Sequence, residues 1–179
     1  MTNHPNDMMN PPNDMPDYLT QWPGLYVRQG DQIIEAPAQD RAVAQRYPTA
    51  HEKGALVDGT RLTLLTEKQT YHINESIRVI HVVEVTKPGH YVYVMGPKPI
   101  YGEYLDDQLA TKPPPLDEDP LAPSMYSGRV LPSPALDYNY DITVYTFVEP
   151  GSHRLQWKMG ALQSNVLTLT ITINGVRLD

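Results

Sequence analysis

Two histidines, His81 and His90, have the clearest potential for metal chemistry. His81 lies in an alternating apolar stretch and His90 begins the next predicted strand, so a hairpin would bring the two imidazoles together. A catalytic zinc site needs three protein ligands, however, and no third ligand is evident. We therefore expect His81 to be a hydrogen-bonded residue of the core, and we expect no metal and no cofactor.

Side-chain oxygens recur at alternate positions in Asp137, Asn139 and Asp141, as they do in calcium-binding loops. The glycine that should follow is replaced by Ile142, and the downstream glutamate is missing. In an extended segment the three side chains would share one face, with the intervening tyrosines on the other. We expect a solvated edge or loop here, with calcium binding as the alternative.

No catalytic motif is recognisable. The sequence lacks the elbow Gly-x-Ser-x-Gly, the zinc motif His-Glu-x-x-His, a phosphate-binding Gly-Lys-Ser/Thr loop and Gly-x-Gly-x-x-Gly. Ser152 precedes His153, but neighbours on a strand point to opposite faces and cannot form a nucleophile–base pair there. We therefore expect that the chain is not an enzyme.

Tyrosine is unusually frequent, with 12 residues against a single phenylalanine. Its large apolar ring and polar hydroxyl suit half-exposed surfaces and protein interfaces. The alternative is that tyrosines replace phenylalanine in a small core with a wet rim. The candidate partner-binding residues are Tyr101, Tyr104, Tyr138 and Tyr140.

A long acidic segment, residues 106–124, contains three consecutive prolines and three consecutive acidic residues. Loops of this length inside a compact domain are usually functional or disordered. Its carboxylates could attract cations, but a solvated run of charge is the commoner role.

The chain has 179 residues, enough for one domain with a core and some additional chain. Its formal net charge of -7 disfavours nucleic acids and anionic membranes as partners. The absence of cysteine excludes disulfides and thiolate chemistry. No targeting segment or membrane-spanning stretch is visible, so we expect a cytoplasmic protein, or an exported one if a signal peptide has been removed.

Apolar and polar residues alternate along most of the chain from residue 60 onward. On the predicted strand 77–86, the odd-numbered residues form one face and the even-numbered residues the other. Six to eight short strands at this spacing are typical of a two-sheet sandwich. The fold class predicted for residues 60–179 is therefore all-β, an antiparallel β-sandwich.

Two further regions precede the sandwich. Residues 1–17 are rich in proline and asparagine, so this arm should be disordered unless a partner orders it. Residues 18–59 predict a small extension: a hairpin over 25–35 with Gly30 in its turn, then a short helix over 37–46 that Pro48 ends. An isolated hairpin is marginally stable, so the extension must pack on the main domain or on a partner.

The pattern Tyr71-x-x-Asn74-Glu75-x-Ile77-x-Val79 resembles the Tyr-x-x-Gly-Glu-x-Ile-x-Val opening of bacterial immunoglobulin-like domains. Residues 150–157 and 162–167 resemble the last two strands of such domains, and the resemblance covers about residues 61–173. It implies an immunoglobulin-like sandwich, a superfold that carries unrelated functions. Asn74 stands in the place of glycine, which asparagine can serve because it tolerates the left-handed conformation. His153 stands where a corner tyrosine is common.

We expect a non-catalytic protein-binding or structural module that could self-assemble through its N-terminal arm or an edge strand. Its partner would then be another protein or a second copy of the chain. The alternative is an intracellular proteinase-inhibitor-like protein that presents residues 106–124 to an enzyme cleft. An enzyme or carbohydrate binder would need a site that the sequence does not reveal.

Overall fold

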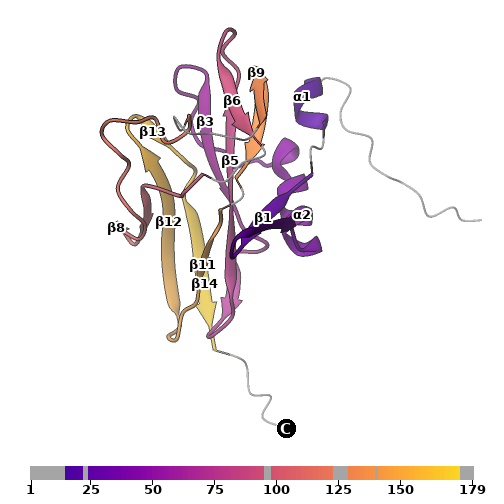
Figure 1. Ribbon diagram of the computed structural model, residues 1–179. Helices are drawn as coiled ribbons and strands as arrows, with labels where there is room; N and C mark the ends of the chain where they lie inside the picture. The colour runs from indigo at the N-terminus through magenta and orange to yellow at the C-terminus, as the bar shows by residue number, and fades with distance from the viewer. Residues whose placement is uncertain (1–14, 22–23, 95–97, 123–128, 140, 174–179) are drawn as a thin grey trace, which may run out of the picture.

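The computed structural model describes residues 15–21, 24–94, 98–122, 129–139 and 141–173 (Figure 1). Within this part the chain is mainly strand with little helix, so the all-β class is confirmed. Two facing sheets form the body, which is consistent with a β-sandwich, and a small N-terminal unit covers one of them. The predicted arm lies almost entirely outside the described residues.

The first sheet is built around β5 (Ile77–Val85). On one side β5 pairs with β3 (Thr60–Leu65), and on the other with β10 (Ala135–Tyr138) and β11 (Thr143–Tyr145), always antiparallel. The predicted division of β5 into two faces is confirmed, because Val79 packs between the sheets while Ile80 and Val82 pack against the N-terminal unit. Both faces of β5 are therefore buried.

The second sheet is centred on β12 (Gly151–Met159). β12 pairs antiparallel with β14 (Leu167–Thr172), with β7 (Glu103–Leu105) and with the short β13 (Leu162–Gln163). The edges are β4 (Thr70–His72), which runs parallel to β14, and β8 (Gln108–Leu109), which follows β7. Asn74, just after β4, has φ 63°, in the left-handed region that asparagine tolerates.

Apolar side chains from both sheets fill the space between them. Leu62, Val79, Leu155 and Leu169 are almost completely buried there, together with Trp157. A further pair of antiparallel strands, β6 (Tyr91–Val94) and β9 (Arg129–Pro132), projects from one end of the sandwich (Figure 1). The inward residues of β12 alternate with outward ones, which is the pattern that identified this strand in the sequence.

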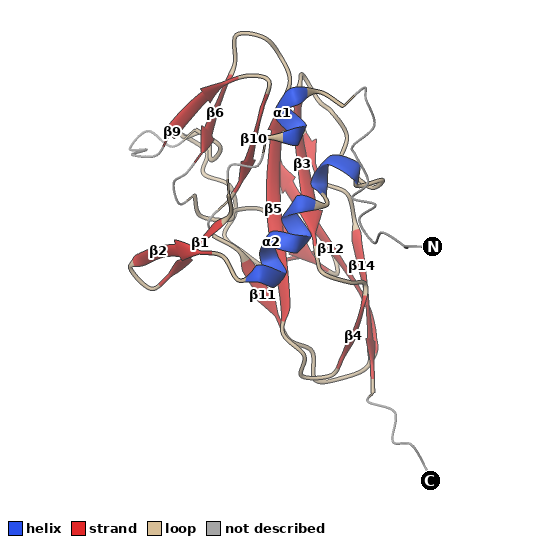
Figure 2. Ribbon diagram, turned by 90° about the vertical axis from the view of Figure 1, so that its right-hand side faces the viewer, coloured by secondary structure: helices blue, strands red, loops and turns tan. Residues whose placement is uncertain are grey.

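The N-terminal unit (α1 to η1) lies over β3 and β5, as Figure 2 shows. It consists of α1 (Asp17–Thr20), the hairpin β1 (Tyr26–Gln29) and β2 (Gln32–Glu35), α2 (Ala38–Gln45) and the 3₁₀ turn η1 (Tyr47–Thr49). The predicted hairpin and helix are both confirmed. Pro37 precedes the first helical residue and Pro48 falls in the turn that follows, so the two prolines mark the ends of α2.

Buried and partly buried polar contacts hold the N-terminal unit on the first sheet. The hydroxyls of Tyr18 and Tyr47 donate to the two carboxylate oxygens of Glu84 over 2.7 Å and 2.5 Å. The Arg78 guanidinium donates to both oxygens of Asp40 in α2, at 2.7–3.0 Å. The pKa of Tyr18 is raised to about 12 by burial, by the hydrogen bond to Glu84 and by the negative charge of Glu84. The Tyr18 hydroxyl therefore remains a donor at neutral pH.

The acidic segment 106–124 is better organised at its start than its composition indicates. Asp106 and Asp107 both adopt positive φ, 50° and 62°, and so form a tight turn between β7 and β8. Farther along, Lys112 forms a parallel bridge with Tyr101, which ties the segment back to the sandwich. The described part of the segment ends at residue 122.

Candidate functional site

The hairpin β1–β2 presents the most exposed strand of the N-terminal unit. All four residues of β2 are exposed, and the apolar side chains Ile33 and Ile34 are 41% and 37% exposed. Gly30 has φ 59°, which the two-residue turn of this hairpin requires. Among the described residues β1 is the sole strand that pairs with β2, so the other edge of β2 is open.

The hairpin is held at a fixed angle by its buried strand and by an ion pair. Leu25 and Val27 on the β1 side are buried against the first sheet. The Arg28 guanidinium donates to both carboxylate oxygens of Asp141 at 2.8 Å and 2.6 Å. Because these contacts hold β1 on the first sheet, the open edge of β2 has a fixed position.

The backbone groups that point outward from β2 follow from the register. Gln29 and Gln32 flank the two-residue turn, and in such hairpins this pair is hydrogen-bonded and the pairs beyond it alternate. Ala36 donates to the Leu25 carbonyl over 2.9 Å, in agreement with this alternation. The N–H and C=O groups of Ile33 and Glu35 consequently face away from β1, where another strand could bind them.

The predicted partner-binding tyrosines lie in different environments. Tyr101 and Tyr104 are half-buried beside the base of segment 106–124, where the Lys158 ammonium lies 4.9 Å from the centre of the Tyr104 ring. Tyr138 is buried and contacts the ring of Tyr47 edge-on, so it faces the N-terminal unit rather than an open surface. Tyr140 lies outside the described residues. Their role in binding stays a prediction.

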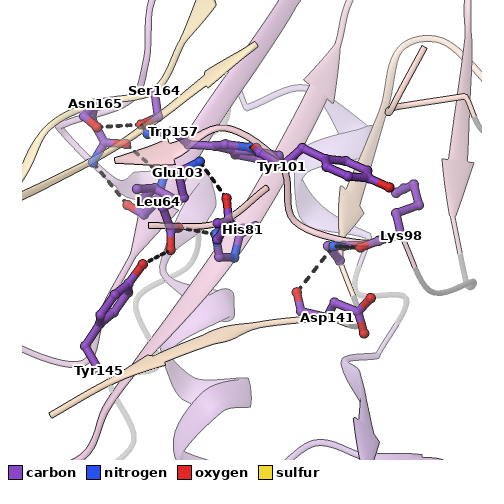
Figure 3. A network of polar contacts seen from close by, with 12 residues as sticks. Leu64, His81, Lys98, Tyr101, Glu103, Asp141, Tyr145, Trp157, Ser164 and Asn165 are labelled. Atoms are coloured by element: carbon purple, nitrogen blue, oxygen red, sulfur yellow. Dashed lines mark hydrogen bonds and ion pairs between the residues drawn. The ribbon is translucent and has the colours of Figure 1, made fainter. Parts of the chain in front are cut away.

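His81 is a hydrogen-bonded core residue, as expected from the sequence. Its Nε2 lies 2.5 Å from Oε2 of Glu103, and the Tyr145 hydroxyl donates to Oε1 of Glu103 over 2.5 Å (Figure 3). His81 and Glu103 are both completely buried, and the Trp157 ring contacts His81 edge-on at 5.0 Å. His90 is exposed in the turn before β6.

The electrostatics of this cluster favour an ionised Glu103. Burial alone would raise the pKa of Glu103, but the charge and hydrogen bond of His81, with the bond from Tyr145, hold it below its usual value. Burial and the neighbouring Glu103 raise the pKa of Tyr145, which keeps its hydroxyl protonated. Because a substrate cannot reach side chains that are completely buried, the cluster serves to join β5, β7 and β11 across the core.

The prediction of a solvated edge at residues 137–141 is wrong for two of the three residues that carry side-chain oxygens. Asp137 and Asn139 are 3% and 2% exposed. Asp137 contacts the Lys98 ammonium, the Asn139 amide donates to the Lys98 carbonyl over 2.6 Å, and Asp141 pairs with Arg28. Asp137 and Asn139 are buried because β6 and the chain before β7 cover them, and the three side chains have different partners.

Metal binding gains no support from the described residues, among which no group of three or more His, Asp or Glu side chains is placed to hold an ion. His153 instead stacks on Phe147 with ring centres 4.0 Å apart. Its Nδ1 lies 2.7 Å from Asp106. Burial opposes ionisation of Asp106, but the bonds from His153 and from the Arg154 backbone outweigh it and lower the pKa of this carboxyl.

A groove of about 490 Å³ lies between the chain that follows α2 and the end of β3. Leu64, Leu65 and Leu167 line it, and Arg46 and Lys68 contribute charge. Both cations are already engaged, since Arg46 donates to the carbonyls of residues 66 and 67 and Lys68 pairs with Glu75. The carboxylates of Glu52 and Glu67 also line the groove. The groove is therefore a weaker candidate than the β2 edge.

Sequence reasoning missed Glu103, Lys98 and Asn165, whose partners are distant in the chain. Each is a polar residue within or beside an apolar strand, and that is the one signal that could have indicated them. No helix within the described ranges is long and apolar enough to cross a lipid bilayer. Comparison of the chain with models of known protein families, with curated proteins and with solved structures found no match.

Proposed function

We propose that the chain is a non-catalytic protein-binding module that self-associates by adding the β2 strand of a second copy to its own β2 edge. The observation that supports this proposal best is the open edge of β2, a strand whose four residues, Ile33 and Ile34 among them, are all exposed. An unpaired edge of this kind is a template for strand addition. We also propose that the sandwich is immunoglobulin-like, for which the two facing, mainly antiparallel sheets and the position of Asn74 are the support.

The register of the proposed pair follows from the outward groups of Ile33 and Glu35. Antiparallel hydrogen-bonded pairs need outward groups on both strands, so Ile33 can lie opposite the partner's Ile33 or the partner's Glu35. The first choice would place Asp31 opposite the partner's Glu35, and these like charges repel. The second places Ile34 opposite the partner's Ile34 on a two-fold axis, which forms an apolar cross-strand contact.

This contact is small. Four residues from each copy bury far less than the roughly 1,200 Å² at which stable protein complexes begin. The net charge of -7 on each chain also opposes association at low salt. We therefore expect a reversible dimer whose population rises with protein concentration and with moderate salt.

Sedimentation equilibrium of the full chain over a range of concentrations tests this proposal. Ile33→Pro removes an outward N–H without removing a bond to β1, so this variant should remain folded and monomeric. Val148→Thr changes an equally apolar residue that is 74% exposed elsewhere, and it should dimerise like the parent. A parent protein that is monomeric at every concentration, or an Ile33→Pro variant that still dimerises, would contradict the proposal.

A second candidate function is presentation of segment 106–124 to an enzyme cleft, as proteinase inhibitors do. Leu116 is 100% exposed and follows three prolines, which restrict the backbone before it. Gly102 and Lys112 join the base of the segment through a 2.8 Å hydrogen bond. Inhibition assays against proteinases that cleave after leucine test this function. Leu116→Gly should abolish inhibition, while Ile33→Pro should retain it.

A further inference from the structure

Lys98 and Asp137 form an ion pair that is almost completely removed from water. Their side chains are 5% and 2% exposed. Lys98 lies between β6 and β7, and Asp137 lies in β10. The Lys98 ammonium contacts the Asp137 carboxylate and the backbone carbonyl of Tyr93.

The backbone of Lys98 is fixed as well as its amino group. The Asn139 amide donates to the Lys98 carbonyl over 2.6 Å, and Asn139 is itself 2% exposed. Asp137 is held by the pairing of β10 with β5, where it lies opposite Val83. The amine and the carboxyl group are thus brought together by chain segments that cannot easily separate.

Such a pair is a poor source of stability as an ion pair, because the cost of removing two charges from water can exceed their mutual attraction. Burial raises the pKa of Asp137, in spite of the opposing charge of Lys98. In a site shielded from water, movement of one proton from Nζ of Lys98 to the carboxylate removes both charges at once, and it leaves an amine and a carboxylic acid in contact. Reacting groups held in this way reach effective concentrations of about 10⁵ M or more.

We propose that Lys98 and Asp137 are the site of an intramolecular amide cross-link that forms once the chain has folded. After proton transfer, the Nζ lone pair attacks Cγ of Asp137 and a nitrogen–carbon bond forms. The tetrahedral carbon then loses its hydroxyl group, which leaves as water with a proton from Nζ. An ammonium and a carboxylate become one amide and one water, so the step needs no oxidant, reductant or other co-reactant.

The surroundings of Lys98 leave room for the water that the reaction releases. A cavity of about 100 Å³, lined by Lys98, Tyr91, Leu121 and Asp119, lies beside the pair. This volume exceeds the roughly 30 Å³ that one water molecule occupies in the liquid. Asp119 lines the same cavity and is exposed to solvent.

The cross-link would join the first sheet covalently to the chain that leads into the second sheet. β10 belongs to the first sheet, and Lys98 lies on the chain that leads into β7 of the second sheet. The closed loop would span a sequence separation of 39 residues. In a chain without cysteine, this bond would restrict the unfolded state as a disulfide does elsewhere.

Intact-mass spectrometry of the denatured full chain tests the proposal directly. The expected mass lies one water, about 18 Da, below the mass of the sequence. Proteolysis should yield a branched fragment that contains both Lys98 and Asp137. The same fragment distinguishes this bond from a loss of water elsewhere in the chain.

Variants complete the test. Lys98→Arg and Asp137→Ala should both restore the full mass, while the matched control Lys68→Arg, which alters a lysine in an exposed ion pair, should keep the loss. Because the parent chain alone gives the decisive mass, a variant that fails to fold leaves the test intact. A folded parent chain with the full mass would show that the pair remains ionic, and a loss of water that persists in Lys98→Arg would place it at another site. Either result would overturn the proposal.

Discussion

The side chain of Asn165 pairs with both backbone groups of Leu64. Its Oδ1 accepts from the Leu64 N–H over 2.8 Å, and its Nδ2 donates to the Leu64 carbonyl over 3.0 Å (Figure 3). Leu64 lies in β3 at the edge of the first sheet, and Asn165 precedes β14 of the second. The Asn165 amide thus forms the hydrogen bonds that a further strand would make with Leu64 at the edge of β3, and it connects the two sheets.

Replacement of Asn165 by alanine should therefore destabilise the protein. The Leu64 N–H and C=O groups would lose their partners at a largely buried position, and we expect a loss of about 2 kcal/mol. Urea denaturation measures this as a lower midpoint with an unchanged slope. Gln163→Ala is the control, since it removes an exposed amide from the same region and should have little effect. Equal midpoints for the two variants would contradict this role of Asn165.

Glu103→Gln should remove the charge that holds the polar cluster of the core together. Without it the His81 ring and the Tyr145 hydroxyl lose a charged hydrogen-bond partner in a site with no access to water, and we expect a loss of about 3 kcal/mol at neutral pH. Thermal and urea unfolding measure the change. Glu149→Gln, which neutralises an exposed carboxylate, is the control and should be nearly neutral.

The same residue should make stability depend on pH in the acid range. The pKa of Glu103 is lowered from its usual 4.5, so below this pH the unfolded chain binds the proton more readily than the folded one. The contribution of Glu103 to the free energy of unfolding is thus fully present above pH 4.5, and it is lost as the pH falls through the pKa of Glu103 in the folded state. Unfolding followed from neutral pH downward should show a steeper loss for the parent than for Glu103→Gln. Parallel curves would show that Glu103 does not contribute.

Arg78→Met should loosen the N-terminal unit from the sandwich. It leaves the Asp40 carboxylate, whose side chain is 2% exposed, without its bidentate partner. The Arg78 side chain is 32% exposed, so water screens part of the interaction and we expect a loss of about 2 kcal/mol.

The double variant Arg78→Met with Asp40→Leu should recover part of that loss, because no charge then remains buried. Lys87→Met, which breaks an exposed ion pair with Asp58, is the control and should leave stability nearly unchanged. A double variant no more stable than Arg78→Met alone would contradict this account.

Much of the sandwich could be predicted from the sequence, because a strand with a buried face reveals itself by its alternation. β12 alternates Leu155, Trp157 and Met159 with polar residues, and the structure buries those three. In β5 the alternation is weaker, since the N-terminal unit covers Ile80 and Val82 on the other face. A continuous apolar strand is the sign of burial on both sides.

The candidate site was harder to predict. Gly30 between polar residues predicts the hairpin. Two adjacent isoleucines, Ile33 and Ile34, usually indicate a buried core, however. Their exposure depends on how the hairpin packs on the sheet. The pairings of His81 with Glu103 and of Lys98 with Asp137 depend on how the facing layers meet. Local sequence patterns do not carry that information, because each partner belongs to a different strand or loop.

Gly102→Ala should be among the most destabilising single-methyl changes in the chain. Gly102 has φ +71°, and a Cβ there would lie 2.0 Å from the backbone carbonyl oxygen of Lys158. The left-handed conformation costs about 1–2 kcal/mol for alanine, and the contact with backbone, which cannot rotate away, raises the expected loss to about 3 kcal/mol. Because the Gly102 N–H also donates to the Lys112 carbonyl, the base of segment 106–124 should shift in this variant.

Gly30→Ala is the matched control for Gly102→Ala. Gly30 has φ +59°, and nothing lies within 4 Å of the added Cβ, so this variant should show the conformational cost alone. Urea midpoints measure both, and a Gly102→Ala loss no larger than that of Gly30→Ala would mean that the close approach to Lys158 does not constrain this position.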